Sequence, residues 1–329
     1  MAAKVTNEPA NYFALGKQSA KDSAATTFHF LKHLDGTELE LDVDAEAERE
    51  GGDGQEVGLH YKRTAKLDGQ ANANARAETA ARFLAWALGD QAAGASFVAT
   101  GVQRHEFFPA ASLPYLTAEQ RYSDQIERGL NTKLTGLTFE GESGRPIKLT
   151  AGLVGGGTFS RRETASALTP ARESGQPFFY PRGSYVIDGT GDSKLTKFKI
   201  EVKRGVDDDI YTTDIFREDV VELNFDADCE FTLRYEDKAL YDKIHYGSGS
   251  TVPIEIATGS FNFSSKFGSG TNTRELEVFL PQIDYTGAKV NKLDPDGKTV
   301  YIDLAGMTVK AATHSVIGKV TLASQADFV

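Results

Sequence analysis

The chain has 329 residues, of which 40% are hydrophobic and 25% charged, and its formal net charge is −11. These values are typical of a folded globular protein with one large or two ordinary domains. The acidic balance excludes binding to DNA by neutralising phosphates over the whole surface. The single cysteine, Cys229, excludes an intrachain disulfide and a multi-cysteine zinc site.

Two further absences concern the membrane and secretion. No apolar run approaches the ~18 residues that a membrane helix needs, so we expect no membrane partner. The first residues lack the apolar centre of a signal peptide, and we therefore expect synthesis in a cytoplasm.

The chain opens with a polar, alanine-rich stretch, residues 1–27, which we interpret as an N-terminal arm. Residues 28–329 are then expected to form a single β-domain. Its first clear strand alternates apolar residues with Glu40, Asp42 and Asp44, which predicts one acidic face.

One segment, "ANANARAETAARFLAWALGD", predicts the main helix. Its apolar residues recur at spacings of three and four and form one stripe: Ala80, Phe83, Leu84, Ala87 and Leu88. Asn74 is the predicted N-terminal cap, and Gly89 stands where a helix-ending glycine belongs. The stripe favours core packing over a partner groove.

The next predicted elements are a short helical turn and a long hairpin. Thr117 and Gln120 have the spacing of a capping box, which favours the helical turn. The hairpin follows in "LTGLTFEGESGRPIKLTAGLVGGGT", where "GESGRP" has the composition of a turn. Leu130 and Leu134 are out of phase with Leu137, and Gly136 lies at the slip, so we predict a β-bulge there.

Alternating segments recur downstream, around residues 198–202, 221–225, 231–235, 276–280 and 300–304. This spacing predicts a mainly β fold, a sandwich or barrel with one main flanking helix. Residues 158–180 and 206–217 are predicted insertion loops. A hairpin at about 130–155 followed by another at about 195–235 hints at an internal duplication.

Motifs for chemistry are weak throughout. The glycines 155–157 lack the lysine of a phosphate loop, and Ser143 lies in a turn rather than a nucleophile elbow. His29 and His33 have no evident third metal ligand, and Asp207–Asp209 lack EF-hand spacing. Acidic neighbours disfavour a Cys229 thiolate. We therefore predict no catalytic residue, cofactor or metal, and no enzyme.

The stretch "RYSDQIERGLNTKLTGLTFEGESGRPIKLTAGLVGGG" resembles the central hairpin of tail tube proteins of long-tailed bacteriophages. Three further pieces resemble the same family in the same order. They are "GLHYKRTAKLDGQANANARAETAARFLAWALG", "DGTGDSKLTKFKIEVKRGV" and "LEVFLPQIDYTG". Together the pieces span about residues 25–310.

The resemblance implies a structural virion protein of the tail, made in the host cytoplasm. Such proteins form rings, usually hexameric, that stack into a hollow tube through which double-stranded DNA is delivered without specific binding. The implied partners are other copies of the chain, a tape measure protein, and tail terminator and baseplate proteins.

Two groups of residues are candidates for this function. The first is the ring-forming hairpin: Leu137, Phe139, Gly141, Glu142, Gly144, Ile147, Leu149 and Leu153. The second is a set of acids that could line the lumen and repel phosphates: Asp42, Asp44, Glu46, Glu140 and Glu142. The alternative for these acids is that they face bulk solvent.

Other functions remain open at this point. The aromatic residues Phe178, Phe179, Tyr180 and Tyr185 could form a sugar platform of a carbohydrate-binding phage adhesin. A contact between rings, or ordinary core packing, explains them better. Another ring of the same fold, a tail terminator or baseplate hub, is a further alternative. An outer-membrane porin is disfavoured by the helix and the missing signal peptide.

Overall fold

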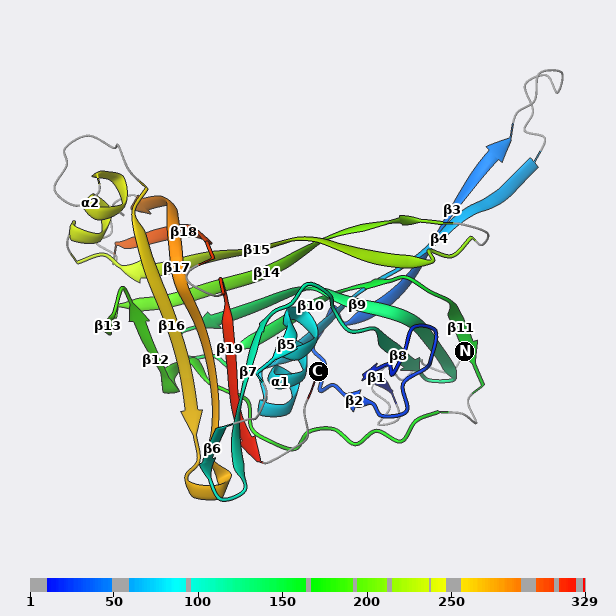
Figure 1. Cartoon of the computed structure of the whole chain (residues 1–329), viewed down its shortest axis with the longest axis horizontal. Helices are drawn as coiled ribbons and strands as arrows, with labels where there is room; N and C mark the ends of the chain where they lie inside the picture. The colour runs from blue at the N-terminus through cyan, green and yellow to red at the C-terminus, as the bar shows by residue number, and fades with distance from the viewer. Residues whose placement is uncertain are drawn as a thin grey trace, which may run out of the picture.

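A computed structural model of the chain describes residues 11–48, 59–92, 96–163, 167–191, 194–211, 215–236, 238–246, 256–290, 300–310, 314–323 and 328. The fold is mainly β with antiparallel pairing between its strands (Figure 1), so the predicted fold class is confirmed.

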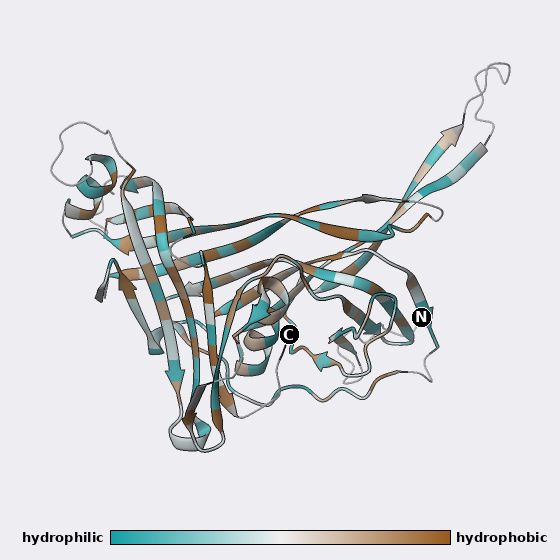
Figure 2. Ribbon diagram, in the orientation of Figure 1, coloured by the Kyte–Doolittle hydropathy of each residue, from teal (hydrophilic) through white to brown (hydrophobic). Residues whose placement is uncertain are grey.

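The main sheet contains long strands that cross the molecule, each antiparallel to its neighbour. Their order is β3 (Glu38–Glu48), β4 (Leu59–Asn74), β10 (Lys148–Gly155), β9 (Gln125–Glu142), β14 (Leu195–Ile210), β15 (Asp219–Arg234), β18 (Tyr301–Thr308) and β17 (Arg274–Val290). In Figure 1 the first and last of these strands lie at opposite ends of the molecule. Apolar and polar bands alternate along the strands in Figure 2, as the period of two requires.

Shorter strands form a second layer. Around the first half are β1 (Tyr12–Lys17), β2 (His29–Phe30), β8 (Leu116–Tyr122) and β11 (Phe159–Arg162). Around the second half are β12 (Gly183–Ile187), β13 (Thr190–Gly191), β16 (Thr258–Phe267) and β19 (Ile317–Ala323). Between them lie β5 (Gly89–Gln91), β6 (Ser96–Ala99) and β7 (Val102–Pro109). Strands β9 and β17 belong to both layers, which makes the sheet continuous.

Two α-helices are described, α1 (Ala77–Leu88) and α2 (Ala239–Tyr246), with single 3₁₀ turns at Tyr180–Arg182 and Gly270–Asn272. Helix α1 packs its apolar stripe against β9, β7 and β19. Gly89 ends it in the left-handed region at φ 90°, as predicted. The predicted cap at Asn74 is wrong, because Asn74 is the last residue of β4.

The cap of α1 comes from a remote segment. The carboxylate of Glu173 accepts the backbone N–H groups of Glu78 at 3.0 Å and Thr79 at 3.1 Å. These are two of the N–H groups that a helix leaves unpaired at its N-terminus. A contact between residues 95 positions apart has no local sequence signal, which is why the nearby Asn74 was chosen instead.

Three predicted segments differ from the structure. Residues 12–17 of the predicted arm form β1, which is almost fully buried between β2 and β8. The predicted helical turn at Thr117 and Gln120 is wrong, because these residues lie inside β8 and are buried. In the predicted loops, residues 159–162 and 206–210 belong to strands β11 and β14. A bulge near Gly205 shifts the alternation and conceals the second of these from pattern reading.

Candidate functional site

The predicted hairpin is present as β9 and β10, and its apolar residues share one buried face. Leu137, Phe139, Ile147, Leu149 and Leu153 are each at most 2% exposed. The bulge predicted at Gly136 is also confirmed, since the pairing slips between Gly152–Gly136 and Leu153–Leu134 and leaves Thr135 as the extra residue. The hairpin thus supplies one apolar wall of the core.

The three other predicted residues lie at the end of β9 and in the turn that follows it. Gly144 adopts φ 84°, a conformation that favours glycine. A Cβ on Gly141 would lie 2.2 Å from the Phe198 ring, so glycine allows β14 to pack closely there. Glu142 is exposed and forms an ion pair with Arg145 at 3.0 Å. Gly141 and Gly144 therefore have structural roles in the turn.

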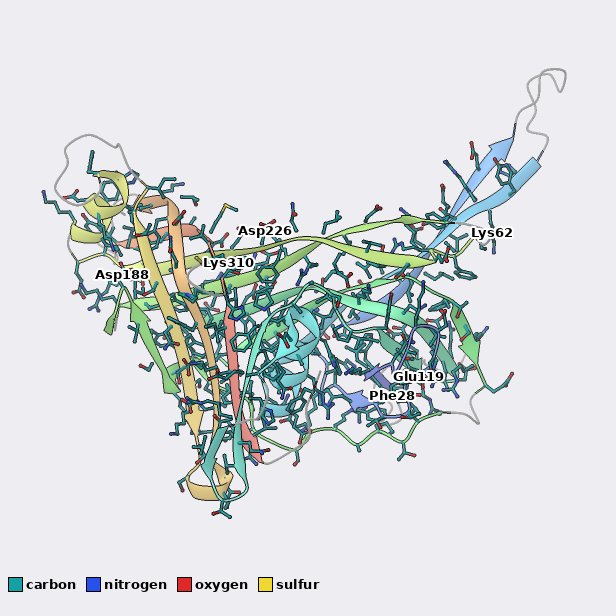
Figure 3. The ribbon with its side chains drawn as sticks, viewed as in Figure 1. Phe28, Lys62, Glu119, Asp188, Asp226 and Lys310 are labelled. Atoms are coloured by element: carbon teal, nitrogen blue, oxygen red, sulfur yellow. The ribbon has the colours of Figure 1, made fainter. Side chains whose placement is uncertain are left out.

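The opposite face of the sheet is charged, with acids and lysines interleaved. Lys199 contacts Glu201 at 2.8 Å, and Lys203 contacts Asp228 at 3.2 Å. The hydrogen bond from Lys199 lowers the pKa of Glu201. Asp226, labelled in Figure 3, extends from the side of β15 that faces away from α1. This face is therefore polar and partly self-neutralised.

The five predicted acids all lie on the main sheet or its turn, but in different surroundings. Glu140 is half-buried and lies beside Lys148 and Lys199 on the neighbouring strands. Asp42, Asp44 and Glu46 are exposed along β3. The sequence reading singled out the acids and omitted the lysines between them, although the alternation of residues 197–203 contained that signal.

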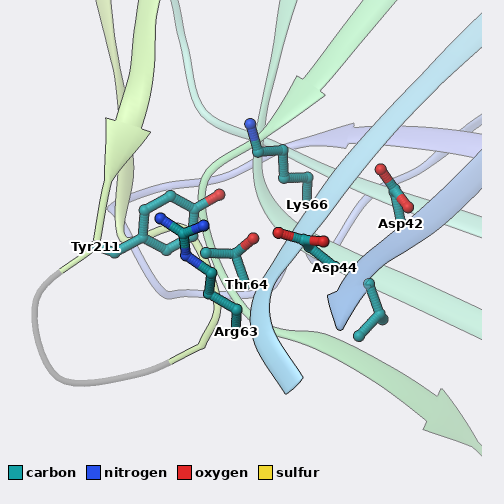
Figure 4. A pocket seen from close by; sticks show the side chains of 7 residues that line it. Asp42, Asp44, Arg63, Thr64, Lys66 and Tyr211 are labelled. Atoms are coloured by element: carbon teal, nitrogen blue, oxygen red, sulfur yellow. The ribbon is translucent and has the colours of Figure 1, made fainter. Parts of the chain in front are cut away.

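A cleft lies beside the acidic residues of β3. Asp42 and Asp44 line it together with Arg63, Lys66 and Tyr211 (Figure 4). Glu46 lies farther out on the same strand, 3.7 Å from Arg63 and 3.3 Å from the hydroxyl of Tyr61. Basic side chains therefore lie beside the acidic ones on β3 and β4, as they do on β14 and β15.

The end of the β14–β15 hairpin is fixed to the first half of the chain by buried charges. Lys133 of β9 donates to Glu222 at 2.8 Å and to the Val220 carbonyl at 2.6 Å, and its side chain is 4% exposed. Arg217 donates to the Gly155 carbonyl at 3.1 Å. Burial acts to raise the pKa of Glu222, but hydrogen bonds from Lys133 and the Leu113 amide outweigh it, so the pKa is lowered.

The glycines that follow β10 are part of the same contact. A Cβ on Gly156 would lie 2.7 Å from the backbone of Asp219, so only glycine permits this approach. The cluster therefore receives another segment of the chain rather than a phosphate. Sequence reasoning missed this contact because its two sides lie more than 60 residues apart.

The two terminal strands of the main sheet have open edges. Among the described residues, β3 forms a ladder with β4 alone, and residues 286–290 of β17 lie in a ladder with β18 alone. A row of unpaired N–H and C=O groups is a template for another strand. The geometry therefore offers one acceptor edge at each end of the sheet.

Buried ionisable groups elsewhere have structural partners. Glu119 is fully buried between Arg128 at 2.6 Å and Arg162 at 2.7 Å. Burial raises the pKa of Cys229 to about 12. Within the described ranges, no three His, Cys, Asp or Glu side chains are grouped as metal ligands. Nor is any described helix long and apolar enough to span a membrane.

The aromatic cluster offers no sugar platform. Phe178 and Tyr180 are buried, and Tyr180 stacks on Tyr185 with 4.6 Å between ring centroids. Phe178 packs against Phe267. These rings pack in the core with Phe263 and Phe267 of β16, and core packing is one of the two interpretations that the sequence favoured over a sugar platform.

A mainly β protein with a two-faced sheet and open end strands has the features of a structural, self-associating protein. The chain belongs to the phage tail tube protein family, whose family model matches residues 10–310. It is therefore a structural protein of a phage tail, and the family is structural rather than enzymatic. A comparison with curated proteins finds no match.

Proposed function

We propose that the chain assembles with copies of itself into stacked rings that form the hollow tail tube, and that DNA is delivered through the lumen. The observation that carries this proposal is the main sheet, with one apolar face in the core, one charged face, and an open strand at each end. Pairing the open ends around a ring removes both edges and encloses the charged face.

The charged face suits a lumen through which DNA slides. Lys199 and Lys203 are held by carboxylates, so they do not form a free cationic stripe that would bind phosphates. The predicted acids Asp42 and Glu140 lie on this face, where negative charge repels DNA. We retain them, with Asp44, Glu46 and Glu142, as the proposed lining, in a pattern that also includes lysines.

Stacking of the rings is assigned to the β3–β4 hairpin. In Figure 1 this hairpin extends beyond the other strands and away from the body. A projecting ribbon with polar faces can reach a neighbouring ring along the tube axis. Sixfold rings, synthesis in the host bacterial cytoplasm, and contacts with tape measure, terminator and baseplate proteins follow from the family resemblance and remain part of this proposal.

Electron microscopy of the purified chain at increasing concentration tests the proposal. The expected result is hollow tubes of constant diameter built from stacked rings. Isolated rings that never stack would indicate a terminator or baseplate hub instead. A chain that stays monomeric under all conditions would contradict the proposed function.

A further inference from the structure

The two halves of the chain repeat the same sequence of elements. In the first unit (residues 12–162), β1, β2, β3, β4, α1, β8, β9, β10 and β11 follow one another, with β5, β6 and β7 inserted after the helix. In the second unit (residues 183–323), β12, β13, β14, β15, α2, β16, β17, β18 and β19 follow in the same order. Each strand has the same partners within its unit.

The correspondence extends to the irregularities. The β9–β10 pairing slips at Thr135, and the β17–β18 pairing slips at Thr286, each followed by a glycine. The β3–β4 pairing slips between Lys62 and Thr64, and the β14–β15 pairing slips between Glu222 and Phe225. Matching bulges fix the alignment of the units residue by residue, because a bulge marks a single position in a ladder.

The internal duplication predicted from the sequence is therefore present, but the two hairpins that the prediction matched are not equivalent to each other. The hairpin at 130–155 corresponds to β17–β18, and the hairpin at 195–235 corresponds to β3–β4. The single β-domain predicted from the sequence thus comprises two units of one design that share a continuous sheet.

Inside the chain, one ladder of the main sheet forms the joint that connects the two units, and β7 of the first unit also pairs with β19 of the second. The last sheet strand of the first unit, β9, pairs with the first strand of the second unit, β14, from Gly136–Lys203 to Glu142–Lys197. The buried Lys133–Glu222 ion pair lies beside this ladder. The equivalent strands at the outer ends, β17 and β3, are the two open edges.

We propose that this joint is repeated between chains, with β3 of one copy antiparallel to β17 of the next, Leu39–Asp42 opposite Val290–Gly287. The proposal rests on the proposed function, since it specifies how rings close. The register follows from the alignment, because Leu39 corresponds to Ile200 and Val290 corresponds to Phe139, and these two residues pair within the chain.

Side chains at the two edges are complementary in this register. On the core side, Leu39 would meet Val290 and Leu41 would meet Ala288, all apolar. On the charged face, Glu40 would meet Lys289. Both are exposed, and neither forms an ion pair with another described residue. Opposite charges directly across a ladder stabilise it.

A second charge match stands beside the ladder. The residue equivalent to Lys133 is Asp284, and the residue equivalent to Glu222 is Lys62, so the buried ion pair would recur with its charges exchanged. Asp284 has a buried Oδ1 that accepts no hydrogen bond from a described residue. Lys62 is exposed on the projecting hairpin, where Figure 3 labels it. Buried polar atoms are normally hydrogen-bonded, and in the proposed joint the ammonium group of Lys62 from the next copy donates to Asp284.

At one position of each edge, a side chain of the same chain bonds the backbone. The amide of Gln120 donates to the Leu39 carbonyl at 2.6 Å and accepts from its N–H at 2.9 Å, as a neighbouring strand would. His245 of α2 lies 2.9 Å from the Ala288 carbonyl. These contacts show that the backbone groups of Leu39 and Ala288 point outward along the edges. A carbonyl has a second lone pair, and the Gln120 side chain can rotate away.

The consequence concerns stoichiometry. Each chain supplies two units, so a ring of six units closes with three chains. This replaces the six chains that the family resemblance implies. The in-chain joints and the between-chain joints then alternate around the ring.

A charge exchange tests the ion pair. Lys62→Glu and Asp284→Lys, each alone, are expected to reduce tube yield at least tenfold, because each places like charges together. The double variant K62E/D284K reproduces the order of charges at the in-chain joint and should restore tubes. Lys17→Glu, at an exposed position of β1 outside both edges, serves as the control. Failure of the double variant to recover, with all variants folded by circular dichroism, would overturn the pair.

A cross-link tests the ladder independently, with both substituted residues exposed. E40C/K289C should form intermolecular disulfides on oxidation, and the largest closed product on a non-reducing gel should contain three chains. Wild-type tubes combined with no cross-link would overturn the proposed joint while leaving the tube function standing. A six-chain product would support the joint and overturn the three-chain ring. Absence of tubes from the wild type would instead contradict the proposed function, and a three-chain product would still support the joint.

Discussion

The β3–β4 hairpin of the first unit and the β14–β15 hairpin of the second unit are equivalent. Their ladders slip at equivalent positions, but their surroundings differ. The β14–β15 hairpin ends on the first unit, where Lys133 and Arg217 hold it. The β3–β4 hairpin projects from the body with Lys62 exposed (Figure 1). One hairpin thus shows the bound form of the joint and the other its free form. The comparison identifies Lys62 as the residue of the free hairpin that we propose contacts the next chain.

Breaking the common core should have the largest effect. Leu149 is fully buried on the hairpin face that faces α1, so Leu149→Asp would place a charge in the core. We expect no folded chain and no tubes. Leu223→Asp is the matched control, because Leu223 is 56% exposed near the start of β15. Solubility and circular dichroism of the two variants provide the measurement, and a folded Leu149→Asp chain would contradict the assignment of faces.

The next test separates the bound hairpin from the free one. Lys133→Ala leaves Glu222 buried without its cation, which typically costs about 3–5 kcal/mol. Lys62→Ala, at the equivalent position of the charge pair in the free hairpin, should change the unassembled chain by less than about 0.5 kcal/mol. Urea unfolding of the unassembled chains compares them. Equal losses would show that the two hairpins do not differ as described.

A pH profile sharpens the comparison of the units. Burial lowers the pKa of His29 to about 3, and the nearby charge of Arg82 acts in the same direction. An unfolded histidine titrates near ~6.5. The unfolded chain therefore gains this proton first, so the stability is fully present above pH ~6.5 and declines as the pH falls toward 3.

The slope assigned to His29 is at most about 1.4 kcal/mol per pH unit. His29→Gln should remove this part of the decline, measured as unfolding midpoints between pH 7 and pH 4. His60→Gln, at an exposed position of β4, is the control. The second unit has Thr190 at the equivalent position and lacks this titration. A profile unchanged by His29→Gln would argue against a neutral, buried imidazole.

The smallest effect concerns the N-terminal cap of helix α1. Glu173 caps α1 from a distant segment, so Glu173→Ala should cost about 1 kcal/mol, as for other lost helix caps. Ser174→Ala, at an exposed neighbouring position, should be neutral. Thermal unfolding of both variants measures the difference. A neutral Glu173→Ala would show that the cap contributes nothing to α1.

Local patterns allowed the sheet to be predicted from the sequence, and distant contacts explain what was missed. Leu149 and Phe139 alternate with polar neighbours, and Gly136 lies at a visible slip in phase, so faces and bulge could be predicted. Lys133 and Glu222 are 89 positions apart and carry no local signal of their contact. The duplication is equally concealed, because Asp284 stands at the position of Lys133 and reverses its charge.

The most direct test of the central claim is a cryo-electron microscopy map of the assembled tube. The account predicts rings of six units from three chains, with β3 beside β17 of the next chain and Glu40 opposite Lys289. The face that carries Glu140 and Glu201 should line the lumen. Six chains in each ring, or that face on the outer wall, would contradict it.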